Sequence, residues 1–248
     1  MPALLLDRGR LVKTVRFKSP AYVGDPVNAV KIYNEKEVDE LVVLDIGATP
    51  QGRAPDLETL AKLTDECFMP LAYGGGLRTL EQVRAVLGLG VEKVILNSVV
   101  AERPAFVTEV ARFCGSQSAV VSMDVNSSFW RRRPQVYTRG GQHCTKVDPV
   151  AYARRAVELG AGELLVCSIE REGTWQGYDL ELLKSVTAAV DVPVVALGGA
   201  GGLEHLRQAV KVGGASAVAL GSMAVYQGKD LGVLINFPAR AALKELFD

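Results

Sequence analysis

The second half of this chain repeats the first at a nearly constant offset. Asp25-Pro26-Val27 returns as Asp148-Pro149-Val150, and Gly75-Gly76 returns as Gly198-Gly199 at the same offset. An offset that holds over so much of a chain indicates an internal duplication, which has to be recognised before any fold is assigned. The duplication predicts an architecture of two similar halves, at about 1–118 and 119–248.

Short apolar runs recur along both halves. They lie at 3–6, 40–45, 71–73, 93–96, 119–124, 163–167, 194–196 and 217–219. Most are rich in Val, Leu and Ile without alternation, which is typical of parallel strands covered on both faces. Segments of helical periodicity separate them, so strand and helix alternate along the chain. This pattern predicts an α/β fold: a (β/α)8 TIM barrel, built from two duplicated half-barrels, that forms a single domain over 1–248. An open doubly wound sheet, the alternative, explains the halving less well and needs a glycine fingerprint that this sequence lacks.

Two connections are longer than the usual turn between a strand and a helix. Residues 7–24 follow the first expected strand, and residues 125–147 follow the fifth. The alternating run at 11–17 predicts a small hairpin in the first loop, and Gly140-Gly141 predicts another in the second. Long loops at the C-terminal rim of a barrel usually cover a functional site.

Composition excludes several classes of function. Lys and Arg total 28 and so do Asp and Glu, so no net positive field exists to attract nucleic acid. The basic run Arg131-Arg132-Arg133 predicts a solvated loop, with a dock for an acidic partner as the alternative. The first residues resemble neither a signal peptide nor a membrane span. Four cysteines without metal-binding spacing, with only two histidines, favour a reducing compartment. We therefore expect a cytoplasmic protein with no metal, no cofactor and no membrane partner.

Glycine-rich segments follow the third and the seventh expected strands. These segments, 74–76 and 198–202, let main-chain N–H groups approach an oxyanion closely. Asn97-Ser98 and Gly221-Ser222 follow the fourth and eighth strands and add further donors. Turns between strands and helices favour glycine in any case, but two such loops, each paired with a serine, predict two phosphate sites. The candidate phosphate-binding residues are Gly75, Gly76, Asn97, Ser98, Gly198, Gly199, Gly201 and Ser222.

Acidic residues end the second and the fifth strands. A carboxylate at the mouth of a largely apolar barrel can have a raised pKa and serve as a general acid or base. We interpret Asp124 as catalytic and Asp45 as close to the substrate, with a loop-orienting role as the alternative for both. Lys13, in the long first loop, is also placed near the substrate, where it would contact an anionic ligand; a solvated hairpin lysine is the alternative.

Charged residues also begin three of the strands. Glu40, Lys93 and Glu163 should form a ring at the N-terminal mouth of the barrel. Charges at this end usually form salt bridges that contribute to stability. A gate into the barrel interior is the alternative interpretation.

Taken together, the motifs resemble the cyclase subunit of imidazole glycerol phosphate synthase over nearly the full length of the chain. The matching segments are 9–13, 24–26, 39–46, 73–76, 97–98, 115–124, 173–174, 177–179 and 198–201. The resemblance implies a glutaminase partner on the N-terminal face, whose ammonia passes through the barrel to a bisphosphorylated ribonucleotide. The products would be imidazole glycerol phosphate and the carboxamide ribotide AICAR.

The same resemblance assigns roles to individual residues. It implies that Gly76, Asn97 and Ser98 hold one phosphate, and that Gly173, Gly199 and Ser222 hold the other. Asp124 matches the family's second catalytic aspartate. Glu40, Lys93 and Glu163 match three of the four charges of the ammonia gate, whose arginine has no counterpart here.

Some positions depart from the family pattern. An alignment without gaps places Leu5 where the first catalytic aspartate is expected, and Asp7 takes that place only if the first loop is two residues shorter. Leucine cannot transfer a proton. Leu197 and Cys167 replace the Ser and Thr that are usual near the substrate, and Glu172 replaces an Asp.

These departures are similar to a paralogous branch of the family that is associated with surface polysaccharides of the O-antigen type. The similarity includes the segments 19–26, 66–70 and 234–238. Membership implies that ammonia from a glutaminase reaches a further partner, a sugar amidotransferase that makes an acetamidino sugar. Three alternatives stay open: a genuine histidine-pathway cyclase, a non-catalytic ammonia conduit that activates the glutaminase, and the sister half-barrel isomerase.

Overall fold

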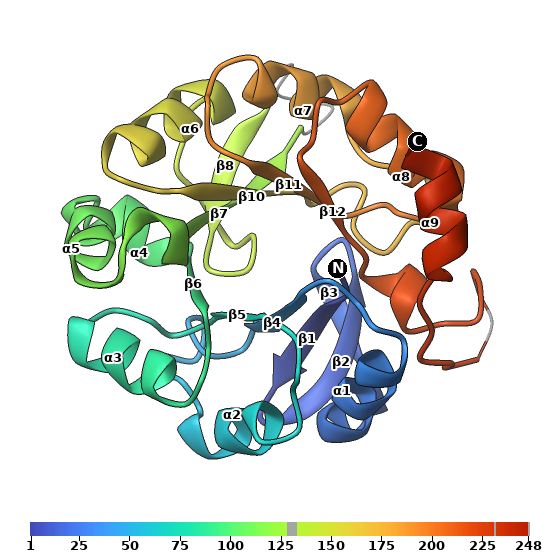
Figure 1. The fold of residues 1–248 in the computed structure, drawn as a ribbon. Helices are drawn as coiled ribbons and strands as arrows, with labels where there is room; N and C mark the ends of the chain where they lie inside the picture. Colours follow the sequence, from blue (N-terminus) through green and yellow to red (C-terminus); the bar gives the residue numbers. More distant parts are fainter. Residues whose placement is uncertain (128–132, 231, 248) are drawn as a thin grey trace.

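Eight parallel strands form a closed barrel inside a ring of helices (Figure 1). This computed structural model describes residues 1–127, 133–230 and 232–247. The barrel strands are β1 (Ala3–Asp7), β4 (Leu41–Asp45), β5 (Leu71–Gly74), β6 (Lys93–Leu96), β7 (Ala119–Asn126), β10 (Glu163–Ser168), β11 (Val194–Leu197) and β12 (Ala217–Ala219). Each pairs in parallel with the next, as the sequence predicted. The predicted (β/α)8 fold is confirmed.

The barrel closes at a seam between its first and last strands. Pro2 and Leu220 form a parallel bridge, and the Ala3 N–H donates to the Leu220 carbonyl at 2.8 Å. The Tyr33 hydroxyl, from the first helix, donates to the Ala224 carbonyl at 2.7 Å and ties the same two ends of the chain together. The seam therefore joins segments that lie more than two hundred residues apart.

The helices lie on the outside of the sheet. They are α1 (Pro26–Glu35), α2 (Leu57–Thr64), α3 (Leu80–Gly88), α4 (Ser98–Glu102), α5 (Ala105–Cys114), α6 (Pro149–Glu158), α7 (Leu180–Thr187), α8 (Leu203–Lys211) and α9 (Arg240–Phe247), with 3-10 turns η1 (Ser116–Ser118) and η3 (Ser222–Ala224). Within the described ranges, none is long and apolar enough to cross a membrane.

The repeated Asp-Pro pairs have the same structural task in both halves. The Asp25 carboxylate accepts the Asn28 N–H at 2.9 Å and caps α1, whose first residue is Pro26. Asp148 caps α6 in the same way, ahead of Pro149. Proline suits the first helical position because it has no N–H to leave unpaired, and each cap contributes about 1 kcal/mol. The duplication is therefore visible as matching helix starts.

Both predicted hairpins are present, and both rise from the C-terminal ends of barrel strands. β2 (Arg10–Val15) and β3 (Lys18–Gly24) extend β1 in antiparallel fashion. β8 (Gln135–Thr138) pairs with β7 and with β9 (His143–Cys144). Of the predicted basic run 131–133, only Arg133 belongs to the described residues, and it is exposed.

Two layers of apolar side chains form the core. The larger layer fills the space between the sheet and the helices. The smaller one fills the barrel interior and consists of Ala3, Val42, Ala72, Ile95, Val120, Leu165, Cys167, Val195, Leu197 and Ala219. Small and branched side chains fill this interior, so the middle of the barrel is a packed apolar core.

Candidate functional site

A cavity of about 310 Å³ opens at the C-terminal ends of the barrel strands. Most of the residues singled out from the sequence line it, namely Lys13, Asp45, Gly75, Gly76, Asn97, Ser98, Asp124, Gly173, Gly198, Gly199 and Ser222. The barrel thus brings together residues from both halves of the sequence. Gly201 is not among the lining residues, because its N–H donates to Nδ1 of His205 at 3.1 Å beside the cavity.

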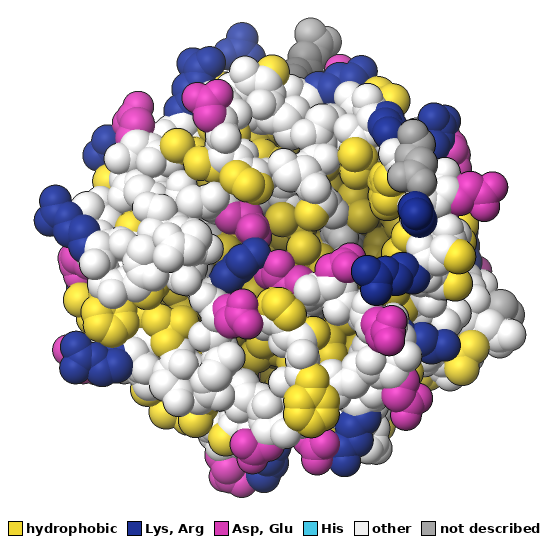
Figure 2. All heavy atoms as spheres, in the orientation of Figure 1, with side chains coloured by type: hydrophobic (Ala, Val, Ile, Leu, Met, Phe, Trp, Pro, Cys, Tyr) yellow, Lys and Arg dark blue, Asp and Glu magenta, His cyan; other side chains and the backbone are white. Residues whose placement is uncertain are grey.

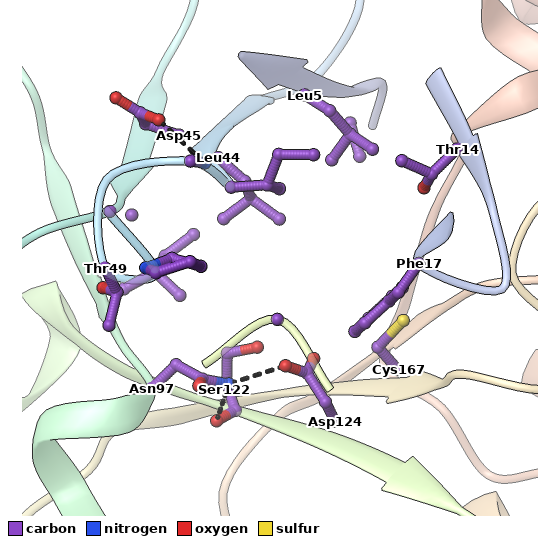
Figure 3. A pocket seen from close by; sticks show the side chains of 18 of the residues that line it. Leu5, Thr14, Phe17, Leu44, Asp45, Thr49, Asn97, Ser122, Asp124 and Cys167 are labelled. Carbon is purple, nitrogen blue, oxygen red and sulfur yellow. Dashed lines mark hydrogen bonds between the residues drawn. The ribbon is translucent and has the colours of Figure 1, made fainter. Parts of the chain in front are cut away.

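Asp124 lines the cavity from the C-terminal part of β7, two residues before the strand ends at Asn126. Its Oδ2 accepts a hydrogen bond from Asn97 Nδ2 at 3.0 Å, and the same amide also donates to the Ser122 carbonyl at 3.2 Å (Figure 3). Burial raises the pKa of Asp124 to about 7, and the bond from Asn97 offsets only part of this effect. A carboxyl group with a pKa near neutrality can both accept and release a proton.

Leu5 lies across the cavity from Asp124 (Figure 3). Because side chains alternate along a strand, Leu5 shares its inward direction with Ala3 of the barrel interior. Asp7 has the same direction, but its Oδ1 accepts a hydrogen bond from Gln51 at 3.1 Å and lies 3.9 Å from Arg53. The inner face of β1 therefore offers an apolar side chain opposite Asp124 and an acid only at the rim.

Asp45 is held by its own loop. Arg53 donates to both of its carboxylate oxygens at 3.2 Å, and Oδ1 also accepts the N–H groups of Gly47 and Ala48. A carboxylate that accepts four hydrogen bonds from its own loop holds that loop in one conformation. The geometry matches the loop-orienting alternative for Asp45, which leaves Asp124 as the less constrained acid.

Lys13 extends from β2 into the mouth of the barrel. It is almost completely buried, and its Nζ donates to the Ala3 carbonyl at 2.9 Å. Burial lowers the pKa of Lys13 to about 8, although the charge of nearby Glu172 opposes this shift. Glu172 is also buried and accepts from Thr14 Oγ1 at 3.0 Å and from the Phe17 N–H at 3.3 Å. Lys13 therefore faces the cavity from within the barrel and is not a solvated hairpin lysine.

The first glycine cradle, Gly75 and Gly76 with Asn97 and Ser98, requires glycine for steric reasons. Gly75 and Gly76 have φ angles of 134° and 70°, which favour glycine. A Cβ atom on either would lie 2.7 Å from a main-chain carbonyl oxygen. Both glycines line the cavity together with Ser98.

The second cradle, Gly198 and Gly199 with Gly173 and Ser222, has the same construction. The φ angles of its three glycines are all positive. A Cβ atom on Gly199 would overlap the Gly177 carbonyl, so the loop after β10 and the loop after β11 approach as closely as backbones can. Ser222 is buried at the edge of the cavity. The two cradles belong to opposite halves of the duplicated chain.

The opposite mouth of the barrel carries the charged group predicted from the strand starts. Lys93 Nζ lies 2.9 Å from Glu40 Oε2 and 2.9 Å from Glu163 Oε2. Burial alone would lower the pKa of Lys93, but the two carboxylates outweigh it and the net shift is upward. In Figure 2, charged side chains gather at the centre of the face on which the N-terminus lies in Figure 1. Glu40, Lys93 and Glu163 therefore form one ion-paired cluster at the entrance to the apolar interior.

Replacing Lys93 with Met should lower the free energy of unfolding by about 1–3 kcal/mol at pH 8, because two partly buried carboxylates lose their shared cation. The loss should shrink at about pH 4, because burial raises the pKa of Glu163 above its ordinary value of 4.5 and its carboxylate is then largely protonated. Urea denaturation of the parent and the variant at pH 8 and at about pH 4 measures this loss. Lys62→Met is the matched control: its pair with Glu58 is exposed, so its removal should leave the free energy of unfolding nearly unchanged. Equal losses in the two variants would show that the cluster contributes nothing special.

Several cavity residues were not found by reasoning from the sequence. Phe17 lies at the turn between β2 and β3, and Ser122 lies in an apolar strand without a distinguishing pattern. Arg53, the partner of Asp45, lies in a loop whose course the sequence does not determine. Cys167 and Glu172 were recognised only as departures from a family pattern. Among the described residues, no three His, Cys, Asp or Glu side chains gather as a potential metal site.

The comparisons with known proteins agree with this geometry. Residues 1–230 match the family model described as histidine biosynthesis protein. The chain is 44% identical over 247 residues to a Leptospira interrogans protein that carries the provisional name imidazole glycerol phosphate synthase subunit HisF, covering 100% of this chain and 97% of the relative. It is 44% identical to the similarly named hisF2 of Pseudomonas aeruginosa, over 96% of this chain and 94% of the relative. Identity to hisF3 of Vibrio vulnificus is 41%, over 100% and 95%.

A duplicated (β/α)8 barrel with glycine cradles at its C-terminal mouth is the class of protein that this fold and cavity define. The chain belongs to the histidine biosynthesis protein family, and within it to the group of imidazole glycerol phosphate synthase subunits of the HisF type. The family is of the lyase or cyclase type. The roles of the individual site residues stay predictions.

Proposed function

We propose that this chain receives ammonia from a glutaminase partner at its N-terminal mouth and supplies it for the synthesis of an acetamidino sugar of a surface polysaccharide. In this proposal a phosphorylated small molecule binds between the two glycine cradles. A sugar amidotransferase is the third partner. The proposal accounts for an intact family barrel whose cavity has an altered set of acids.

The position of Leu5 is the observation that carries this proposal. Ring closure by the family's usual chemistry needs a second proton-transferring group opposite Asp124, and the cavity has a leucine there. Asp7 is engaged by Gln51, and Asp45 by Arg53. Among the described residues of the cavity, the other two acids, Glu102 and Glu172, are also hydrogen-bonded to partners.

The packed apolar side chains of the barrel interior favour the neutral form of ammonia over the ammonium ion. The lining of this interior is apolar, and moving an ammonium ion through such a lining would be far more costly than moving ammonia. The cluster of Lys93, Glu40 and Glu163 lies where the path would begin. The same cluster would select between charged and neutral species at the entrance.

A genuine histidine-pathway cyclase is the second candidate. It is favoured by Asp124, whose pKa of about 7 suits general acid–base catalysis, and by two intact cradles for a bisphosphorylated substrate. Under this alternative Asp124 acts alone or with Asp7.

Turnover of the bisphosphorylated ribotide, with saturating ammonium salt at alkaline pH, separates the two candidates without any glutaminase. We expect no turnover above background, while calorimetry still detects binding of the ribotide. Reconstitution with a glutaminase and a sugar amidotransferase should then make formation of the acetamidino sugar dependent on glutamine and on this chain. Efficient cyclase turnover would overturn the proposal in favour of the histidine pathway. Absence of both turnover and binding would instead indicate an ammonia conduit with vestigial cradles.

A further inference from the structure

The hairpin of β8 and β9 is attached to the first cradle through one residue. The Arg139 main-chain N–H donates to Ser98 Oγ at 2.9 Å. Its guanidinium Nη2 donates to Glu102 Oε1 at 2.7 Å. Ser98 and Glu102 are the first and last residues of α4, and both line the cavity. Arg139 therefore lies at the edge of the first cradle, although forty residues of sequence separate it from Ser98.

The bond to the main chain leaves Ser98 able to bind a ligand. Its hydroxyl oxygen accepts from Arg139, while its own proton points to Asn97 Oδ1 at the longer distance of 3.2 Å. A hydroxyl can accept one hydrogen bond and donate another at the same time. The Ser98 proton can consequently turn to a phosphate oxygen without releasing the hairpin.

The ion pair between Arg139 and Glu102 is easily exchanged. The two side chains are 55% and 48% exposed, and pairs this exposed contribute little to stability. A phosphate dianion offers a guanidinium two parallel charge-assisted hydrogen bonds, which are stronger than a single contact to an exposed carboxylate. An unpaired Glu102 at the cavity edge would repel that phosphate.

The second half of the duplication lacks this arrangement. At the offset that relates Ser98 to Ser222, Glu102 corresponds to Tyr226. The second cradle therefore has no carboxylate at the matching position. The charged pair is a property of the first cradle, not of the ancestral repeat.

We propose that Arg139 is a phosphate-binding residue of the first cradle and that Glu102 occupies it until the ligand arrives. The phosphate monoester of the ligand takes the guanidinium from Glu102, and Ser98 keeps the hairpin in place during the exchange. The ligand class is thus an organic phosphate dianion at this end of the cavity. The inference rests on the proposed function, because it assumes that the cradles bind phosphate.

Residue-resolved NMR titration with inorganic phosphate tests it. The amide signals of Gly76 and Ser98 report on the first cradle, and those of Gly199 and Ser222 report on the second as an internal control. Arg139→Gln should weaken phosphate binding at the first cradle by about 10-fold or more, and Arg139→Lys should weaken it less. Glu102→Gln should tighten binding there by about 3-fold or more, because it removes both the competitor and a repulsive charge. Affinity at the second cradle should not change.

The direction of the Glu102→Gln effect distinguishes two roles of the ion pair: competing with the phosphate for Arg139, or only holding the hairpin in place. If the ion pair only holds the hairpin, its removal would weaken binding at the first cradle or leave it unchanged, and either result overturns the inference. Glu158→Gln, which breaks the somewhat more exposed pair with Arg155, is the control and should change affinity at neither cradle. If phosphate shifts neither set of amide signals, the proposed phosphate site itself fails and the inference fails with it. If both cradles bind phosphate and the Arg139 variants leave the affinity of the first cradle unchanged, only the inference fails.

Discussion

The Asp124→Asn variant should be more stable than the parent chain at pH 8, and should lose any capacity to cyclise the ribotide. The folded state holds the Asp124 proton with a pKa of about 7, against an ordinary value of 3.8. Above both values the parent chain must keep an ionised carboxylate in a poorly solvated position, and asparagine removes that cost. Three pKa units correspond to at most about 4 kcal/mol, so we expect a gain of about 2–4 kcal/mol.

The pH dependence fixes the sign of this effect. Between pH 4 and pH 7 the unfolded chain has released the Asp124 proton while the folded chain retains it, so the stability of the parent falls as pH rises through this window. The stability of Asp124→Asn should not fall in this way, so the free energies of unfolding of the two proteins should differ least at about pH 4. Urea denaturation at pH 4, 6 and 8 measures it.

Asp45→Asn is the matched control, because it changes another buried aspartate of the same mouth. Asp45 is paired with Arg53 and two main-chain N–H groups, so its replacement should destabilise the chain at pH 8 by about 1.5–3 kcal/mol. Opposite signs for the two variants would distinguish a group kept for chemistry from one kept for structure. A destabilised Asp124→Asn variant would contradict the raised pKa.

Leu5→Asp should create cyclase activity that the parent chain lacks. The new carboxylate would lie opposite Asp124 across the cavity and beside Lys13, whose ammonium group donates to the neighbouring Ala3 carbonyl. A second positioned acid contributes about 10²–10⁴-fold to a reaction of this kind. We therefore expect turnover of the ribotide with ammonium at least about 100-fold above background. Loss of the buried leucine should cost about 1.5–3 kcal/mol of stability.

Two further variants make this result interpretable. Leu5→Asn has nearly the same shape as the aspartate variant but cannot transfer the proton, so it should stay inactive. Adding Asp124→Asn to Leu5→Asp should remove the new activity by about 100-fold or more. If Leu5→Asp folds, binds the ribotide and still fails to turn it over, the missing acid is not the main difference. The changed side chains Cys167 and Leu197 in the cavity would then be the cause.

The architecture could be predicted from the sequence because it depends on patterns that repeat. The apolar runs and the Asp-Pro helix starts at Asp25 and Asp148 recur in both halves, and each is determined by its local neighbours. The two hairpins were predictable for the same reason, from alternation and from the turn at Gly140-Gly141. Strand ends also place side chains at a known rim, so most of the candidate site residues line one cavity.

The partners of those residues could not be predicted, because they come from irregular loops. Nothing in the sequence indicates that Arg53 folds back onto Asp45, or that Gln51 engages Asp7. Arg139 reaches Ser98 only because the hairpin of β8 and β9 folds over the cavity. Such contacts depend on tertiary packing between segments far apart in the chain, and short-range patterns do not encode them.

The seam has a consequence for how the chain matures during translation. β1 leaves the ribosome before the other strands of the barrel, and its neighbour β12 leaves after them. β2 covers this edge of β1 at Leu5–Asp7, but until Leu220 is made the edge at Pro2 and Ala3 has no partner. Nascent chains of this barrel are therefore open sheets for most of their synthesis, with edges that favour aggregation. Truncations that remove β12 should therefore leave the barrel permanently open at this seam.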